Sequence, residues 1–239
     1  MSNQIPAATT WQLFWLSESV LSIRFAHVID QAINQTLHKV RKQLLAAQWP
    51  NLIEIVPAYC ELALQFSVPV YVREQIEMEV RTLLLQVSES AEQSTIRIIE
   101  IPVCYGDEFG PDLLSLSAHT GLTVQEIIVR HCATDYQVAM LGFMPGFPYL
   151  LGLDPCLAMP RKSTPRLSVP AGSVAIGGAQ TGIYPTSSPG GWQLIGRSSV
   201  SLFDWHRAQP CLLQAGDRVR FSAISRAQIE HSTVRIIHA

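Results

Sequence analysis

The sequence predicts two domains, an α+β domain over residues 1–95 and a mainly β domain over residues 96–239. The chain has 239 residues, of which 48% are hydrophobic. This is enough for two modest cores, because domains usually contain about 100–200 residues. Helical and strand-like patterns alternate in the first part, whereas most glycines and prolines lie in the second part and separate short apolar runs. That change is typical of a step from a mixed domain to a β-rich one.

The first expected elements are a β-hairpin and a helix. Residues 12–16 and 20–25 form two strand-like runs. Asp30 is the expected N-cap of a helix whose apolar positions recur with helical spacing. These positions are Ile33, Leu37, Val40 and Leu44.

Two further strands and a second helix follow. Residues 52–56 and 61–67 are β-rich, and Pro57 separates them. The second helix is amphipathic, and its apolar side consists of Ile76, Val80, Leu83, Leu84 and Val87. Residues 96–101 form a closing strand. This order of elements is typical of a ferredoxin-like α+β sandwich with an added hairpin.

The second part is expected to form a closed β-barrel with two short helices near its start. The predicted strands are 173–176, 192–195, 200–203 and 218–221. The predicted helices are 112–118, ended by Gly121, and 124–130, opened by the capping pair Thr123 and Glu126.

The helix pair also resembles a DNA-reading helix-turn-helix. Its second helix, however, offers Arg130 as its only firm cation, and the chain has 17 Lys and Arg against 19 Asp and Glu, a net charge of -2. The chain therefore lacks the excess of positive charge that proteins use to bind nucleic acid or anionic lipid. We therefore expect the helices to cover one end of the barrel, and the partners to be proteins or small molecules.

The cysteines and the start of the chain predict a cytoplasmic protein. The five cysteines are widely spaced and contain no C-x-x-C pair, so neither a zinc site nor a redox centre is expected. Reduced thiols suit the cytoplasm. The first residues show no basic region followed by an apolar core, so no secretory signal is expected.

The loops between residues 143 and 197 are the expected binding region. Their many prolines and glycines fix the backbone, as a preorganised surface requires, although tight barrel corners would need the same residues. The familiar nucleotide-binding, metalloprotease and hydrolase motifs do not occur in the sequence. A ligand site must therefore be sought among individual side chains.

Arg161, Lys162 and Arg166 concentrate positive charge in these loops and suit a carboxylate or a phosphate. The alternative is a solvated face or ion pairs to Asp112 or Asp154, which we favour for Lys162 and disfavour for the two arginines. An anionic ligand is thus the prediction for this segment.

Uncharged groups accompany the cations. Gln180 and Tyr184 can supply neutral hydrogen bonds to an amide or a carboxylate. Gly177, Gly178 and Gly182 permit either a close approach of the backbone to an anion or a tight turn between strands, and the turn is favoured.

His131 is the candidate proton carrier. It ends a predicted helix and lies four positions before Asp135, a carboxylate that can orient it. A histidine at a helix C-terminus is also stabilised by the helix dipole without any catalytic role. Both interpretations remain open.

Five strings of the sequence resemble one family. They are YGDEFGPDL (105–113), LGFMPGFPYLLGLDP (141–155), TPRLSVPAGSVAIGGAQTGIYPTSSPGGWQLIGR (164–197), SLFD (201–204) and LLQAGDRVRF (212–221). By them the chain is identified as a member of the family of 5-oxoprolinase B subunits, also described as allophanate hydrolase subunit 1 or a sporulation histidine-kinase inhibitor. The match covers the second domain almost end to end, and the segment after Phe221 has no recognised counterpart.

The resemblance implies a ferredoxin-like first domain and a cyclophilin-like barrel. It also implies an enzyme subunit, inactive alone, that works together with an A subunit, and with a carboxyltransferase-like C subunit, to convert 5-oxoproline to glutamate with hydrolysis of ATP. Mg²⁺ would accompany the ATP, and no metal ligands are expected in this chain. Two alternative functions follow from the same family: an inhibitor of a sensor histidine kinase, and a carboxyltransferase component of an allophanate hydrolase or urea carboxylase system.

The resemblance further implies a groove and roles for its residues. Arg161 and Arg166 would bind the substrate carboxylate or a phosphate, and the turn from Gly177 to Gly182 would offer backbone amides to an oxyanion. His131, with Asp112, would be catalytic and move a proton. The full expected lining is Asp112, His131, Phe147, Tyr149, Arg161, Arg166, Gln180 and Tyr184.

Overall fold

A computed structural model describes residues 11–67, 69, 72–87 and 97–238 of the chain. The chain divides into two compact units, residues 1–93 and 94–239. The predicted boundary between residues 95 and 96 falls within 88–96, outside the described residues. Each unit has its own hydrophobic core.

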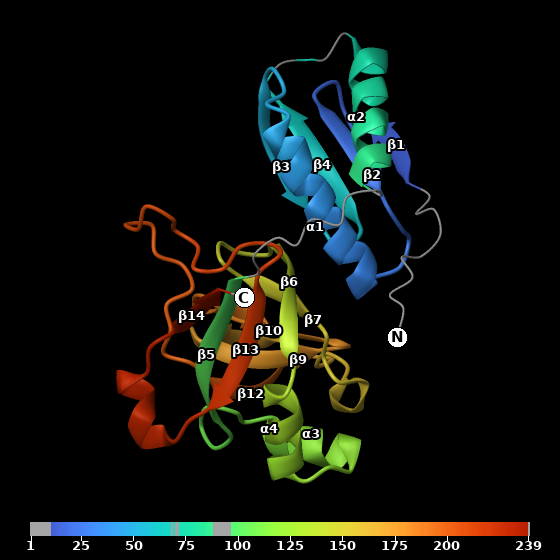
Figure 1. Cartoon of the computed structure of the whole chain (residues 1–239). Helices are drawn as coiled ribbons and strands as arrows, with labels where there is room; N and C mark the ends of the chain where they lie inside the picture. Colours follow the sequence, from blue (N-terminus) through green and yellow to red (C-terminus); the bar gives the residue numbers. More distant parts are fainter. Residues whose placement is uncertain (1–10, 68, 70–71, 88–96, 239) are drawn as a thin grey trace. The chain divides into compact units, whose positions relative to one another are not determined.

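The first unit is an α+β sandwich, as the sequence predicts. Its elements are β1 (Gln12–Trp15), β2 (Val20–Arg24), α1 (Gln31–Ala46), β3 (Leu52–Pro57), β4 (Glu61–Phe66) and α2 (Arg73–Val87). The strands form one antiparallel sheet in the order β1-β2-β4-β3. Helices α1 and α2 pack against each other on one face of this sheet (Figure 1).

The start of α1 confirms the predicted cap. Asp30 Oδ1 accepts a hydrogen bond of 2.9 Å from the backbone N–H of Ile33, which satisfies one of the donors left free at a helix N-terminus. Leu37, Val40 and Leu44 are buried on the face of α1 that packs on the sheet. The hairpin strand β1 takes the edge position beside β2, and the strand after α2 belongs to the second unit.

The second unit is a closed barrel of mixed strands. Its strands are β5 (Arg97–Tyr105), β6 (Asp135–Leu141), β7 (Pro148–Leu151), β8 (Arg166–Val169), β9 (Ser173–Gly177), β10 (Gln180–Ile183), β11 (Ser188–Gly190), β12 (Gln193–Arg197), β13 (Arg218–Ala223) and β14 (Arg235–His238). Seven of them follow the order β12-β9-β10-β7-β6-β13-β5, and pairing of β12 with β5 closes the ring. Strand β13 is parallel to β5, whereas β14 is antiparallel to it. Strands β8 and β11 form a separate hairpin.

Two helices near the start of the barrel unit confirm the predicted pair. They are α3 (Leu113–Thr120) and α4 (Val124–Cys132), and they lie together at one end of the barrel (Figure 1). Gly121 ends α3 with a φ of 73°. Thr123 and Glu126 form the predicted capping box, since Glu126 N–H donates to Thr123 Oγ1 at 3.2 Å and Thr123 N–H donates to Glu126 Oε2 at 2.8 Å.

The inner and outer faces of the barrel strands carry different clusters. On β9, Val174 and Ile176 face the barrel core, whereas Ala175 faces a smaller cluster on the outside. Because loops cover that outer cluster, β9 is buried along its whole length. This covered outer face holds most of the predicted site residues.

One predicted strand is wrong. Residues 200–203 form a loop in which only Phe203 makes a bridge, to Cys211. The neighbouring strand β12 already pairs with β9 and β5, so this segment finds no free sheet edge. Leu212 N–H donates instead to the Leu202 carbonyl at 2.8 Å and closes a local loop. Among the described helices, none is long and apolar enough to cross a membrane.

Candidate functional site

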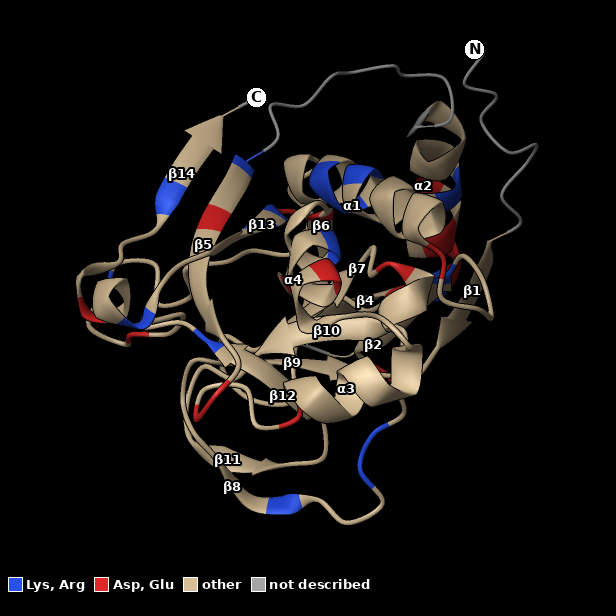
Figure 2. Cartoon of the chain, turned by 90° about the horizontal axis from the view of Figure 1, so that it is seen from below, with Lys and Arg blue, Asp and Glu red and all other residues tan. Residues whose placement is uncertain are grey.

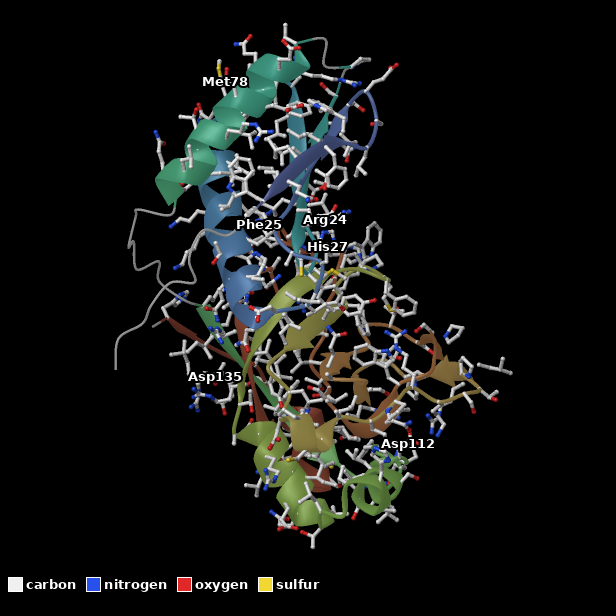
Figure 3. The ribbon with its side chains drawn as sticks, turned by 90° about the vertical axis from the view of Figure 1, so that its right-hand side faces the viewer. Arg24, Phe25, His27, Met78, Asp112 and Asp135 are labelled. Carbon is white, nitrogen blue, oxygen red and sulfur yellow. The ribbon has the colours of Figure 1, made fainter. Side chains whose placement is uncertain are left out.

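Asp112 is the buried carboxylate at the centre of a partly exposed charge cluster. It directly precedes α3 and is 3% exposed (labelled in Figure 3). Its Oδ1 accepts hydrogen bonds from Lys162 Nζ at 3.0 Å and from Arg166 Nη2 at 2.7 Å, and its Oδ2 accepts one from Leu194 N–H at 2.7 Å. We call Asp112, Lys162 and Arg166 the Asp112 cluster.

These donors keep Asp112 ionised. Burial alone would raise the pKa of its carboxyl group, but the hydrogen bonds from Arg166, Leu194 and Lys162 outweigh burial and hold the pKa below its ordinary value. An ionised carboxylate with three donors is poorly suited to exchange protons. It is well suited to orient the two cations.

The partner of Arg166 corrects one expectation. The sequence favours an ion pair to Asp112 for Lys162, which the structure confirms, and disfavours one for Arg166, which is wrong. The physical reason is the burial of Asp112, because a buried carboxylate requires compensating charge. Asp154, the other proposed partner, pairs with Arg130 at 2.8 Å.

Arg161 stands on a backbone segment that is fixed at three points. Met159 pairs with Gly178, the Pro160 carbonyl accepts from Gln193 Nε2 at 2.8 Å, and Lys162 N–H donates to the Gly191 carbonyl at 2.7 Å. The Arg161 side chain is exposed and lies over Trp192, with 5.5 Å between its guanidinium carbon and the ring centre. In the described part of the chain it forms no ion pair.

Four aromatic residues form the outer cluster beneath Arg161. Phe147 is its centre, with ring centres 5.0 Å from Tyr149, 5.3 Å from Tyr184 and 5.6 Å from Trp192. Burial raises the pKa of Tyr184, while a hydrogen bond with the Trp192 backbone and the charges of Arg161 and Arg166 act in the opposite direction. Figure 2 shows Lys and Arg, in blue, on β8 and on the loop before it.

The glycine-rich turn after β9 serves this packing. A Cβ atom on Gly177 would meet the Trp192 ring at 2.5 Å, so only glycine lets the ring lie against the strand. Gly178 adopts a φ of 67°, and its N–H donates to the Met159 carbonyl at 2.8 Å. That amide is consequently not available to an oxyanion in this conformation. Gln180 follows the turn and opens β10.

His131 lies in the barrel interior, apart from the outer cluster. It is fully buried and stacks on Phe221, with ring centres 4.6 Å apart. Its Nε2 is 3.0 Å from Thr181 Oγ1 and its Nδ1 is 2.7 Å from Tyr105 Oη. Because Thr181 Oγ1 donates to the Ala175 carbonyl, it must accept from Nε2–H, and Nδ1 then accepts from the Tyr105 hydroxyl.

Burial lowers the pKa of His131 to about 3, so the ring is neutral at physiological pH. Asp135, the carboxylate expected to orient it, instead binds Arg220 through two hydrogen bonds of 2.7 and 2.9 Å. The structure therefore brings together the predicted cations and aromatics but places His131 elsewhere. Among the described residues, no group of three or more His, Cys, Asp or Glu side chains is arranged to hold a metal ion.

Phe143 is a residue that sequence reasoning missed. It has a φ of 69° and its side chain is 65% exposed. This left-handed conformation costs a side chain such as Phe about 1–2 kcal/mol. Its ring centre lies 5.6 Å from that of Phe147, at the margin of the aromatic cluster. The Pro145-Gly146 turn beside it in the sequence is the only signal that points to it.

A small α+β unit followed by a closed mixed barrel is the architecture of the class of domain whose family model is described as "Carboxyltransferase domain, subdomain C and D". That model matches residues 11–213 of the chain. The chain is 42% identical over 225 residues to the 5-oxoprolinase B subunit of Bacillus subtilis, covering 90% of this chain and 93% of that protein. It is 40% identical over 210 residues to the protein of the same name in Escherichia coli O157:H7, covering 87% and 94%. The chain belongs to the family of 5-oxoprolinase B subunits, as its sequence strings indicate.

A solved structure extends the likeness to the fold. The crystal structure of TTHA0988 matches with a TM-score of 0.75 and 38% identity, over 86% of this chain. The match spans only 40% of that longer chain. In that protein the two units described here are therefore part of a larger polypeptide.

Proposed function

We propose that this chain is the B subunit of a cytoplasmic 5-oxoprolinase, which opens 5-oxoproline to glutamate with hydrolysis of ATP together with the A and C subunits. The observation that carries the proposal is the 42% identity with the Bacillus subtilis B subunit over 93% of its length. The five cysteines, all in the described part of the chain and all free, fit a reducing compartment.

The chemistry explains why ATP is needed. The amide of the lactam is resonance-stabilised and resists attack by water. Transfer of the terminal phosphoryl group of ATP to the amide oxygen releases ADP and makes the ring carbon electrophilic. Water then adds to that carbon, the C–N bond breaks, and glutamate and phosphate are released. Mg²⁺ accompanies the ATP, and we assign the activation to the B and C subunits and the opening to the A subunit.

The contribution we propose for this chain is anion binding on the outer face of the barrel. Three cations, Arg161, Lys162 and Arg166, lie in one loop and strand, and only Asp112 among the described carboxylates neutralises them. Arg161 would hold the substrate carboxylate or a phosphate group, and Arg166 would add its positive charge, because its Nη2 is bonded to Asp112 and its Nη1 is buried. Asp112 would act as a positioning residue, because its oxygens are occupied by the cations and by Leu194 N–H.

The neutral residues complete this proposal. Gln180 would supply a hydrogen bond. Tyr184 is 2% exposed and its hydroxyl bonds with the Trp192 backbone, so it belongs with Phe147, Tyr149 and Trp192 to the support beneath the cations. The interior position of His131 favours a structural role over proton transfer.

Reconstitution tests the function. The isolated chain is expected to form no glutamate from 5-oxoproline and ATP, and activity should appear when the A and C subunits are added. Robust ATP-dependent glutamate formation by the chain alone would overturn the division of labour. An inactive mixture, combined with inhibition of a histidine kinase or with biotin-dependent carboxyl transfer, would favour one of the two alternative functions.

Replacing Arg161 with alanine tests the anion site. The expected result is a loss of about tenfold to a hundredfold in kcat/KM of the assembled enzyme, because one charged hydrogen bond contributes about 1.5–3 kcal/mol. Stability should change by less than about 0.5 kcal/mol, since the side chain is exposed. Arg235→Ala, which removes another exposed arginine, on β14, is the control and should leave activity unchanged. A lower melting temperature with full activity would contradict the assignment.

A further inference from the structure

Three side chains form a row on the outside of the barrel, across the seam where it closes. Strand β12 pairs with β9 on one side and with β5 on the other, and its last residue, Arg197, lies opposite both Ser173 and Cys104. Directly opposite residues point to the same face of a sheet, with Cβ atoms about 4.5–5.5 Å apart. Because the neighbours Val174 and Val103 face the barrel core, the row faces outward.

Arg197 is held in place by small and aromatic neighbours. Gly172 has a φ of 78°, and a Cβ atom on it would lie 3.4 Å from Arg197 Cγ, so the stem of the arginine lies against this glycine. The guanidinium carbon lies 5.2 Å from the ring centre of Phe109. The charged group therefore has a fixed position at one end of the row.

Two buried polar atoms of the row lack a hydrogen-bond partner. Ser173 is fully buried, and its Oγ bonds with nothing in the described part of the chain. Arg197 Nε is also buried and finds no acceptor there. The guanidinium group touches the Phe109 ring but forms no ion pair among the described residues. Each of these features destabilises the fold on its own, because the hydrogen bonds to water are lost and not replaced.

The cover over this row can open. Phe109 lies in the loop between β5 and α3, and Arg226 approaches its ring, with 6.0 Å between the guanidinium carbon and the ring centre. Arg226 pairs with Glu108 of the same loop at 2.7 Å, and the two side chains are 74% and 47% exposed. Such exposed ion pairs contribute little to stability, so Arg226 can exchange Glu108 for an incoming anion.

We propose that this row is a second anion site, which binds a phosphate group through Arg197 and Ser173 and closes over it with Arg226. Arg197 donates from Nε and from its terminal nitrogens, and Ser173 donates from its hydroxyl group. Trp192, which supports Arg161, precedes β12, whereas Arg197 ends it, about 15 Å away along the strand. The site is thus separate from the one that contains Arg161.

Charge favours phosphate over the other occupants of such a space. A buried water molecule satisfies two hydrogen bonds but leaves the charge of Arg197 without a partner. A phosphate group carries about 1.5–2 negative charges at pH 7 and accepts bonds in several directions, which matches two arginines and a hydroxyl group. The carboxylates of the covering loop, Asp107 and Glu108, are both exposed and can turn toward solvent.

The test is calorimetric titration of the chain with inorganic phosphate at constant ionic strength, in an Arg161→Ala background that removes the other proposed anion site. This chain should bind one phosphate with a Kd of about 1 mM or below. Arg197→Met keeps the apolar stem and should weaken binding by at least about 10-fold. Ser173→Ala should weaken it by about 3–10-fold, and the melting temperature without phosphate should stay unchanged or rise, because no hydrogen bond is lost.

Arg235→Met is the matched control. Arg235 is another exposed arginine that follows β13, and it lies 3.9 Å from Glu100. This variant should bind phosphate as the Arg161→Ala background does. Acetate, titrated in place of phosphate, should bind at least about 10-fold more weakly, since a single negative charge leaves one arginine unmatched.

Three results would contradict the proposal. The first is absence of phosphate binding, or binding that Arg197→Met leaves unchanged. The second is a lower melting temperature of phosphate-free Ser173→Ala, which would assign the two buried atoms to an ordered water molecule. The third is acetate binding as tight as that of phosphate, which would make the row a carboxylate site.

Discussion

Replacing Asp112 with alanine is expected to destabilise the barrel unit by about 3 kcal/mol, because it leaves Lys162 and Arg166 without their carboxylate and Leu194 N–H without an acceptor. The loss should appear as a lower midpoint in urea denaturation of the isolated chain. Asp112→Asn is the matched comparison, since it keeps an acceptor oxygen but removes the charge, and it should cost about half as much.

The same substitution should change the response to acid. The pKa of Asp112 is lower in the folded chain than the ordinary value of 3.8, so its contribution to stability is present above pH 3.8 and is lost as the pH falls toward the folded-state pKa. The Asp112→Ala variant should lack this contribution. Equal denaturation midpoints for wild type and Asp112→Ala would show that the cluster does not stabilise the fold.

Replacing His131 with alanine is expected to destabilise the barrel unit by about 3 kcal/mol, through a cavity in the core and loss of partners for Tyr105 and Thr181. The side chain is fully buried and packs on Phe221, so neighbouring groups can collapse only in part. Urea denaturation at neutral pH measures the loss. A stable variant whose assembled enzyme loses about a hundredfold in kcat would instead support the proton-carrier role that the sequence suggests.

The buried His131 should also make the stability of the fold sensitive to acid, in a second pH range. Its pKa is about 3 in the folded chain and 6.5 for an ordinary histidine. Between these values the unfolded chain binds a proton that the folded chain does not bind, so stability is complete above pH 6.5 and falls with pH by up to about 1.4 kcal/mol per unit. In the His131→Ala variant the slope of stability against pH should be smaller by that amount. An unchanged slope would contradict the neutral, buried state.

Local signals in the sequence predict the helices well. The caps at Asp30 and Thr123 and the left-handed end at Gly121 are satisfied within a few residues of chain, and the structure confirms all three. Some strands are less predictable because they are only four residues long and contain proline or glycine. Strands β7 and β10 escape prediction from the sequence, although each is central to the barrel.

The candidate site, too, is predictable where neighbouring residues determine it and unpredictable where the folded barrel does. The positive segment and its aromatic support are readable as residue types, and resemblance places them in one family. The pairing of Arg166 with Asp112 joins residues 54 positions apart, and the burial of His131 depends on closure of the whole barrel. Phe143 is recognisable only from its backbone angle and exposure, neither of which the order of residues specifies.

Strand β5 has a consequence for how the chain is made. Its partners in the barrel, β12, β13 and β14, all follow it in the sequence. During synthesis, the apolar run from Arg97 to Tyr105 must wait for about 120 further residues before β13 emerges, a delay of roughly 6–24 s at about 5–20 residues per second. The first unit has all its strands and helices by residue 87 and can fold during this interval. Strand β5, which has paired neighbours on both edges in the finished protein, therefore stays unpaired longest on the ribosome. We expect chaperone binding to the nascent chain to be concentrated at this strand.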